Sequence, residues 1–368
     1  MHLGRIYFPA LFLTVWVAAQ QEAPTAKKFS IPVWHPDARW KLDPKPYALD
    51  TNCRAHLDGP RHEAMWVHGI YPRLLGGFDG GGRYVFMSCD EKSGRVHAVT
   101  CGAAGYPDGP FSRARFYVDD YHSGRHERAW SPDLRFYYML SSFYEQRIRV
   151  LDFARQKVVT LPTKGVVFAC GESGKLYVVQ GFSPARSALI LSPGPEWKVL
   201  GRVELKGEVR LSGLGCSAAV DEKRGRLYCT TYRADPFYVW YWDLKDGSYH
   251  GVLPNSKGKR GARPMGEAGP FEGTVLYNHG EISWGPDDPE KRFLYVTRVD
   301  DANLYRLDLE RRIMAVFSVK KGRFVESGKG DGRPLYMYPP LWLPDGSFVG
   351  IVPWYFDPPH YKFFRRIK

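Results

Sequence analysis

The sequence has few of the features of helical, metal-ribbon or nucleotide-binding proteins. After residue 20, no segment of ten or more residues shows clean helical periodicity. The six cysteines form no Cys-x-x-Cys or Cys-x-x-Cys-His motif, which excludes zinc-ribbon and c-type haem sites. No glycine-rich phosphate loop of the Walker type is present, and no linker or low-complexity tract divides the chain. These absences favour one non-helical domain.

The pattern of apolar and turn residues is typical of short strands. Aromatic residues make up 15% of the 368 residues, and Tyr, Phe, Trp and Val recur in short alternating runs. The 38 glycines and 28 prolines are spread along the chain at the spacing expected of turns. The composition therefore predicts an all-β protein.

One stretch, His279 to Val319, contains a complete structural unit. It predicts four strands separated by turn residues, at 281–284, 293–297, 304–309 and 313–319. Four strands of this length bury a sheet face only when a similar unit packs against them. The pattern should therefore recur along the chain.

The pattern does recur. Trp130 to Tyr137 and Trp342 to Phe348 repeat its tryptophan, its Pro-Asp turn and its aromatic strand. Weaker copies of the second strand begin at Arg83, Lys175 and Arg226. The third strand repeats its ending, an aspartate followed by an apolar residue: Asp152-Phe153, Asp243-Leu244 and Asp308-Leu309.

The intervals between second strands, about 40 to nearly 70 residues, are close to those of propeller blades with inserted loops. The repeats resemble the β-propeller superfamily over nearly the whole chain after residue 20. This resemblance implies a single β-propeller of four-stranded blades over residues 20–368. Six blades are predicted, and a seventh is possible from residues 29–75. Strands at 29–34 or 40–42 are expected to close the ring with the C-terminal segment 360–367.

The N-terminus has the pattern of a secretory signal peptide over residues 1–19. His2 and Arg5 precede an apolar run from Ile6 to Val17, and Ala18-Ala19 provides a small-residue cleavage site. A secreted or periplasmic protein is expected, with no membrane segment after cleavage. Export makes disulfides possible. Cys216 and Cys229 should lie nearly opposite each other on two strands, where the alternatives are a bridge and a buried free cysteine.

In a propeller, residues just ahead of the innermost strands converge at one mouth of the central channel. Three histidines, His68, His126 and His279, are predicted to occupy such positions in separate blades, and His122 is close enough to replace His126. Loops on the same face carry arginines: Arg147, Arg186, Arg233 and Arg298. Alternatively, each imidazole caps its own loop and each arginine is an ordinary solvated side chain.

The formal charge of +13 favours an anionic partner. Nucleic acid is not expected for an exported chain without a recognition motif. A polysaccharide that contains uronic acid fits better, because exposed rings can stack on sugars while arginines bind carboxylates. A monomer is expected.

The predicted mouth is similar to that of propeller polysaccharide lyases and related glycosidases. This resemblance implies that arginine neutralises a uronate carboxylate, and that histidine or tyrosine moves the protons of a β-elimination. We assign His279 or His126 as the base and Tyr277 or Tyr144 as the proton donor. Arg233 and Arg298 are assigned to the carboxylate, with Arg186, Arg147 and His122 nearby.

Three other functions stay open. His68, His126 and His279 are a possible site for a divalent metal, although the cofactor is unknown. A non-catalytic propeller that binds carbohydrate or protein is equally compatible with this fold. A hydrolase or lactonase would place calcium on Asp120, Glu127 and Glu281.

Overall fold

A computed structural model describes most of the chain from Val67 to Arg366. The predicted signal peptide and the strands expected at 29–42 lie outside the described residues. The described ranges are 67–68, 74–79, 83–89, 96–102, 107–110, 114, 128–133, 135–142, 145–152, 154–155, 157–181, 184–211, 217–230, 237–254, 268–273, 276, 280–285, 288–298, 303–320, 323–327, 341–342, 348–352 and 360–366.

The described residues form antiparallel sheets of about four strands, which confirms the all-β, propeller-like fold. The first sheet contains β1 (Val67–His68), β2 (Leu74–Asp79), β3 (Arg83–Cys89) and β4 (Val96–Gly102). The second contains β6 (Arg128–Trp130), β7 (Phe136–Ser142), β8 (Arg147–Asp152) and β9 (Lys157–Lys164). The third contains β10 (Val167–Cys170), β11 (Leu176–Gln180), β12 (Ser187–Leu191) and β13 (Val199–Glu204).

Three further groups follow along the chain. The fourth sheet contains β14 (Ser217–Asp221), β15 (Arg226–Thr230), β16 (Phe237–Asp243) and β17 (Tyr249–Pro254). The fifth group contains β19 (Gly280–Trp284), β20 (Phe293–Arg298), β21 (Leu304–Asp308) and β22 (Ile313–Lys320). The last contains β24 (Leu341–Trp342), β25 (Phe348–Val352) and β26 (His360–Arg366), joined to the fifth group through β23 (Arg323–Ser327).

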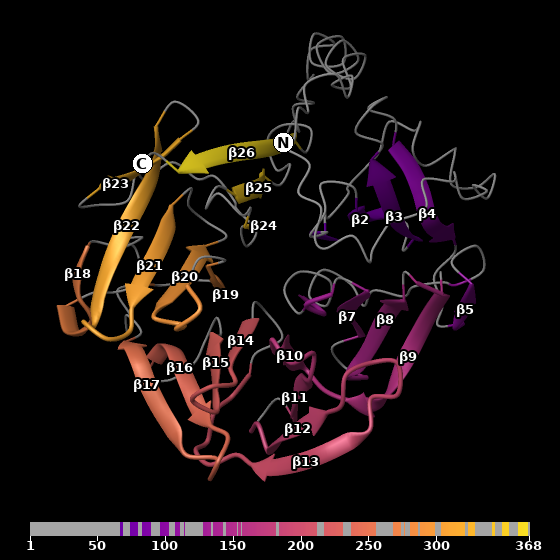
Figure 1. Cartoon of the computed structure of the whole chain (residues 1–368), viewed down its shortest axis with the longest axis horizontal. Coiled ribbons are helices and arrows are strands. Elements are labelled where there is room, and N and C mark those ends of the chain that lie inside the picture. The colour runs from indigo at the N-terminus through magenta and orange to yellow at the C-terminus, as the bar shows by residue number, and fades with distance from the viewer. Residues whose placement is uncertain are drawn as a thin grey trace, which may run out of the picture.

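Figure 1 shows these groups arranged around a common centre. The first strands of neighbouring sheets, β6, β10, β14 and β19, lie next to one another in that order. The C-terminal strand β26 pairs with β25, and it pairs in parallel with β23 through Arg323 opposite Arg365 and Phe324 opposite Arg366. The N-terminal strand expected to close the ring lies outside the described residues.

The sequence repeats correspond closely to these strands. The four strands predicted in the unit from His279 to Val319 are confirmed as β19 to β22, and Asp152, Asp243 and Asp308 each end a third strand. One repeat was misplaced: Arg83 begins the third strand of its sheet, because the two-residue β1 precedes β2.

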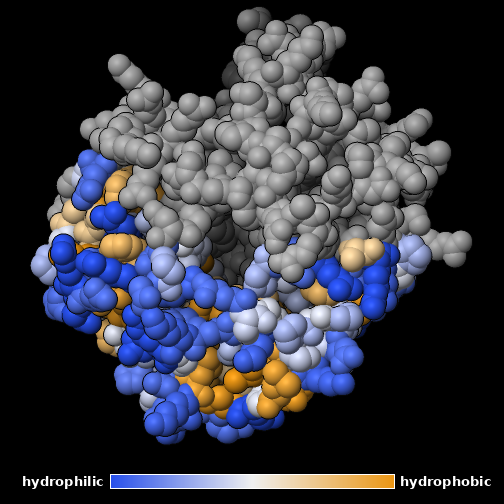
Figure 2. All heavy atoms as spheres, viewed as in Figure 1, coloured by the Kyte–Doolittle hydropathy of each residue, from blue (hydrophilic) through white to orange (hydrophobic). Residues whose placement is uncertain are grey.

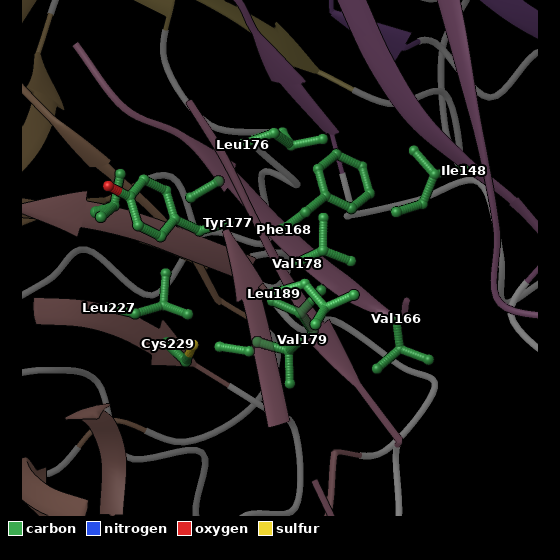
Figure 3. Close-up of a cluster of buried hydrophobic side chains, with 14 of the residues drawn as sticks. Ile148, Val166, Phe168, Leu176, Tyr177, Val178, Val179, Leu189, Leu227 and Cys229 are labelled. Atoms are coloured by element: carbon green, nitrogen blue, oxygen red, sulfur yellow. The ribbon is translucent and has the colours of Figure 1, made fainter. Parts of the chain in front are cut away.

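Apolar side chains pack between neighbouring sheets. Figure 3 shows part of this core: Ile148 from β8 and Phe168 from β10 lie on the side of the β11 residues Leu176 and Val178. Leu227 from β15 lies on the other side, by Tyr177 and Val179. A second cluster joins the fourth sheet to the fifth group and includes Tyr238, Leu294 and Tyr305. The third and fourth sheets therefore bury apolar side chains on both faces, because each packs between two neighbours.

Short Gly-Pro strands cover the outer edges of two sheets. β5 (Gly109–Pro110) pairs with Val158 and Lys157 at the start of β9. β18 (Gly269–Pro270) pairs in the same way with Met314 and Ile313 at the start of β22, and a 3-10 turn, η3 (Phe271–Gly273), follows it. The sequence analysis missed this shared Gly-Pro-Phe motif.

The expected alignment of Cys216 with Cys229 differs from the observed register. Ala218 lies opposite Cys229 and Ser217 lies opposite Thr230, so the alignment is offset by two positions. Cys216 itself lies outside the described residues. Within the part of the chain that the structure describes, we find no helix with the length and apolar character needed to cross a membrane.

Candidate functional site

The direction of the strands defines one end of the sheets as the candidate site. In an antiparallel sheet, the loop between the second and third strands lies at the end where the first strand begins. We call this end the entry face and define it by Arg147, Arg186 and Arg298, which follow or end such second strands. The structure therefore places three of the four predicted arginines on one face, and Arg233 lies outside the described residues.

Hydrogen bonds tie the second and third sheets together at this face. Gly165, between β9 and β10, donates its backbone N–H to the carbonyl oxygen of Gln146 at 2.9 Å. The Gln180 side chain at the end of β11 donates to the carbonyl oxygen of Lys164 at 3.2 Å and accepts from the Ser187 hydroxyl at 3.2 Å. The loops that carry Arg147 and Arg186 are therefore neighbours.

The two arginines differ in their charge environment. Arg147 forms an ion pair with Glu145 at 2.8 Å, across the turn residue Gln146. The sequence analysis missed Glu145, although its position two residues from Arg147 was a usable signal. The Arg186 side chain is exposed, and its backbone forms two hydrogen bonds. Its N–H donates to the carbonyl oxygen of Gln180 at 2.9 Å, and its carbonyl oxygen accepts from the N–H of Leu205 at 2.8 Å. The backbone of Arg186 is thus fixed, and its charged side chain is accessible to solvent.

Arg298 lies next to the predicted base in the sheet register. It is the last residue of β20 and pairs with Gly280, the first residue of β19. Gly280 directly follows His279 in the chain. The β19–β20 register therefore brings the backbone of Arg298 within one residue of His279.

Several predicted site residues lie outside the described residues: His122, His126, Tyr144, Arg233, Tyr277 and His279. Their neighbours are placed, since β6 begins two residues after His126 and β19 begins one residue after His279.

The position of His68 in its strand differs from the predicted position. His68 was expected ahead of a first strand, but it is the last residue of β1 and pairs with Leu75 near the start of β2. It therefore lies toward the end where first strands finish. The difference arises because β1 comes before Gly69, where the strand was predicted to start.

Most of the residues predicted to bind a metal, His126, His279, Asp120 and Glu127, lie outside the described residues, so the metal predictions stay predictions. In the described part of the chain, no group of three or more His, Cys, Asp or Glu side chains is arranged to hold a metal ion. Of the carboxylates considered for calcium, Glu281 lies in β19 opposite Thr297, and Asp120 and Glu127 are outside the described residues.

The opposite end of the sheets, which we call the turn face, carries the turns between first and second strands and is cross-linked. Glu222 accepts hydrogen bonds from the Ser173 N–H at 2.7 Å, the Ser173 hydroxyl at 2.5 Å and the Tyr177 hydroxyl at 2.9 Å. Lys291 forms an ion pair with Glu172 at 2.5 Å, which links the fifth group to the third sheet. Burial raises the pKa of the Cys170 thiol at this end to about 12, so it is protonated at neutral pH.

Comparison with known proteins identifies the fold and no family. No family model matches the chain, and no curated protein matches it. Among solved structures, it resembles a protein of unknown function from Bacteroides thetaiotaomicron, with 13% identity, a TM-score of 0.53, and coverage of 82% of this chain and 70% of that one. An auxiliary nutrient binding protein from Bacteroides ovatus shares 12% identity at a TM-score of 0.43, with coverage of 74% and 66%.

The class of the protein follows from the sheets and the first of these comparisons. It is an all-β, propeller-like protein built from four-stranded antiparallel units. At 13% identity the likeness is to the fold, and function must be argued from the residues of this chain.

Proposed function

We propose that this protein binds a uronic-acid-containing polysaccharide at the entry face and cleaves it by β-elimination. The observation that supports the proposal is the register of Arg298 with Gly280, because the backbone of a predicted carboxylate ligand lies opposite the residue that follows the predicted base His279 in the sequence.

The arginines supply the electrostatic part of the reaction. A guanidinium binds a carboxylate through two parallel N–H donors. Neutralising the uronate carboxylate makes the hydrogen on carbon 5 more acidic. Arg298 is assigned to the sugar at the reacting position. Arg186, an exposed cation of the third sheet at the same face, is assigned to another uronate of the polymer.

The elimination removes one proton from the sugar and adds one proton to the departing oxygen. His279 removes the proton from carbon 5, the electron pair forms a double bond between carbons 4 and 5, and the bond from carbon 4 to the glycosidic oxygen breaks. Tyr277 or Tyr144 protonates the departing oxygen. An ordinary histidine titrates near pH 6.5, so it acts as a base at neutral pH without a large pKa shift.

The test is to incubate the purified chain with a panel of uronate polymers and follow the ultraviolet absorbance of the unsaturated product. His279→Ala is expected to lower kcat by about 10²–10⁴-fold. Arg298→Ala is expected to lower kcat/KM by about 10²–10³-fold, because it removes a charge at the reacting carboxylate. Arg311→Ala is the matched control, since it removes an exposed arginine from the turn between β21 and β22, at the other end of the sheet.

The outcomes separate catalysis from binding. Binding without an absorbance rise, with affinity unchanged in His279→Ala, would identify a carbohydrate-binding protein and overturn the lyase assignment. If none of the polymers is bound or cleaved, the anionic-glycan proposal is wrong.

A further inference from the structure

The outer edge of β13 is apolar and exposed. β13 is the last strand in the order of its sheet. Its first two residues, Val199 and Leu200, are 58% and 56% exposed, and with Ile313 they are the exposed large hydrophobic residues of the described part of the chain. Figure 2 shows apolar surface at the lower edge of the molecule, in the region where β13 runs in Figure 1.

Two other outer strands show how this fold covers the same position. The starts of β9 and β22 are each paired with a Gly-Pro strand, and their second residues, Val158 and Met314, are 0% and 1% exposed. Among the described residues, no strand pairs with the outer edge of β13. An uncovered apolar edge is a template for strand pairing.

The open part of this edge is short. Beyond Glu204, the Lys206 N–H donates to the carbonyl oxygen of Gly247 in the next sheet at 2.8 Å, so that end is occupied. Val199 to Val203 therefore form the available segment, with Gly201 at its centre. A β-carbon at Gly201 would contact only the Ile190 side chain, at 3.8 Å, so the backbone is accessible at the centre.

We propose that this edge pairs with the same edge of a second copy, antiparallel and around a two-fold axis at Gly201. Such an interface is self-complementary. The axis at Gly201 places Lys198 of one copy beside Glu204 of the other, twice. Within one chain Lys198 pairs with Glu196 at 2.7 Å and Glu204 pairs with Arg202 at 2.6 Å, so the contacts between copies would extend these exposed ion pairs. An axis at Arg202 would place the two Arg202 side chains opposite each other, and an axis at Leu200 would place Lys198 opposite Arg202. Both alternatives bring like charges together across the strand pair, so charge favours the axis at Gly201. This inference is independent of the proposed function and departs from the monomer expected from sequence.

The association is expected to be weak. Five residues of strand edge bury far less than the ~1,200 Å² of a stable interface, so we expect a dissociation constant on the order of 0.1–1 mM. Such an interaction is relevant where copies of the chain are concentrated.

Sedimentation equilibrium of the purified chain over a range of concentrations tests the proposal. Leu200→Lys is expected to weaken self-association by about tenfold or more, because it places two cations against the facing edge. Ile313→Lys is the matched control, since it makes the same kind of change at the exposed residue whose strand is already covered by β18.

A charge swap tests the register. Lys198→Glu is expected to weaken association, and Lys198→Glu combined with Glu204→Lys is expected to restore it. A chain that stays monomeric up to millimolar concentration overturns the proposal. Equal effects of Leu200→Lys and Ile313→Lys, or a double variant that does not recover, would also overturn it.

Discussion

Two of the aspartates that end third strands, Asp308 and Asp152, bind the turns and strands beside them. Asp308 accepts hydrogen bonds from Arg292 Nε at 3.1 Å and Nη2 at 2.6 Å, and from the backbone N–H groups of Glu310 and Arg311 at 3.2 and 3.1 Å. Asp152 accepts in a similar way from Arg135 Nε at 3.5 Å. Asp308 and Asp152 are therefore structural, and each is bound by the arginine that directly precedes the second strand of its sheet, Arg292 and Arg135.

Replacing this carboxylate should destabilise the fold. Asp308→Ala is expected to lower the free energy of unfolding by about 1–2 kcal/mol, because donors at a partly buried turn lose their acceptor. Asp308→Asn should cost less, since it keeps one acceptor oxygen for the turn. Urea unfolding at pH 7 measures both, with Glu208→Gln as a control at an exposed carboxylate.

The Asp308 carboxylate should also make the stability of the fold depend on pH. The hydrogen bond from Arg292 lowers the pKa of Asp308 below its ordinary value of about 3.9. A lowered pKa means that the stabilisation is complete above pH ~4 and is lost as pH falls through the folded-state pKa. The stability difference between the wild type and Asp308→Asn should therefore shrink in acid. A difference that grows in acid would contradict this assignment.

At the scale of the element, two turn glycines of the fourth sheet differ in their surroundings. Gly225 in the β14–β15 turn and Gly247 in the β16–β17 turn both have positive φ, 64° and 73°. A β-carbon at Gly225 would meet nothing within 4 Å, whereas at Gly247 it would collide with the backbone of Glu204 in the third sheet. The second glycine allows a turn of one sheet to pack against a strand of the next.

This contrast predicts unequal effects of one substitution. Gly225→Ala is expected to cost about 1 kcal/mol, the cost of a left-handed residue with a side chain. Gly247→Ala should cost about 2–4 kcal/mol, since it adds a clash and disturbs the hydrogen bond with Lys206. Thermal or urea unfolding measures the difference, and equal costs would show that the contact between sheets adds nothing.

At the scale of the whole molecule, neighbouring sheets are joined by polar contacts as well as by the apolar core. Glu222 binds the preceding sheet through Ser173 and Tyr177, and Lys223 pairs with Glu290 of the following group at 2.5 Å. These contacts lie on the turn face, opposite the entry face. They stabilise the end of the molecule that the proposed site does not use.

A double-mutant cycle tests this joint. Glu222→Ala is expected to cost about 1–3 kcal/mol, because it leaves the partly buried Tyr177 hydroxyl without its acceptor. Tyr177→Phe alone should cost less. In the Glu222→Ala background, Tyr177→Phe should cost nothing further, and additive costs would show that the two groups are not coupled.

The net charge also makes a prediction at this scale. If the basic entry face binds a uronate polymer, the dissociation constant should rise steeply as NaCl is raised from about 0.05 to about 0.5 M, because salt screens attraction between exposed charges. Affinity measured by titration at several salt concentrations checks this. A salt-independent affinity would indicate recognition through uncharged sugar hydroxyls.

The sequence by itself determined the local pattern: where strands of the repeating unit start and stop, and that an aspartate ends three of the third strands. These features depend on residues close together in the chain, so Phe293 to Arg298 could be located from turn residues and aromatic alternation alone. Contacts between strands and between sheets decided the rest. The partner of Asp308, the need for Gly247, the Gly-Pro covers and the position of His68 each depend on which distant backbone lies alongside, and short-range pattern does not contain that information.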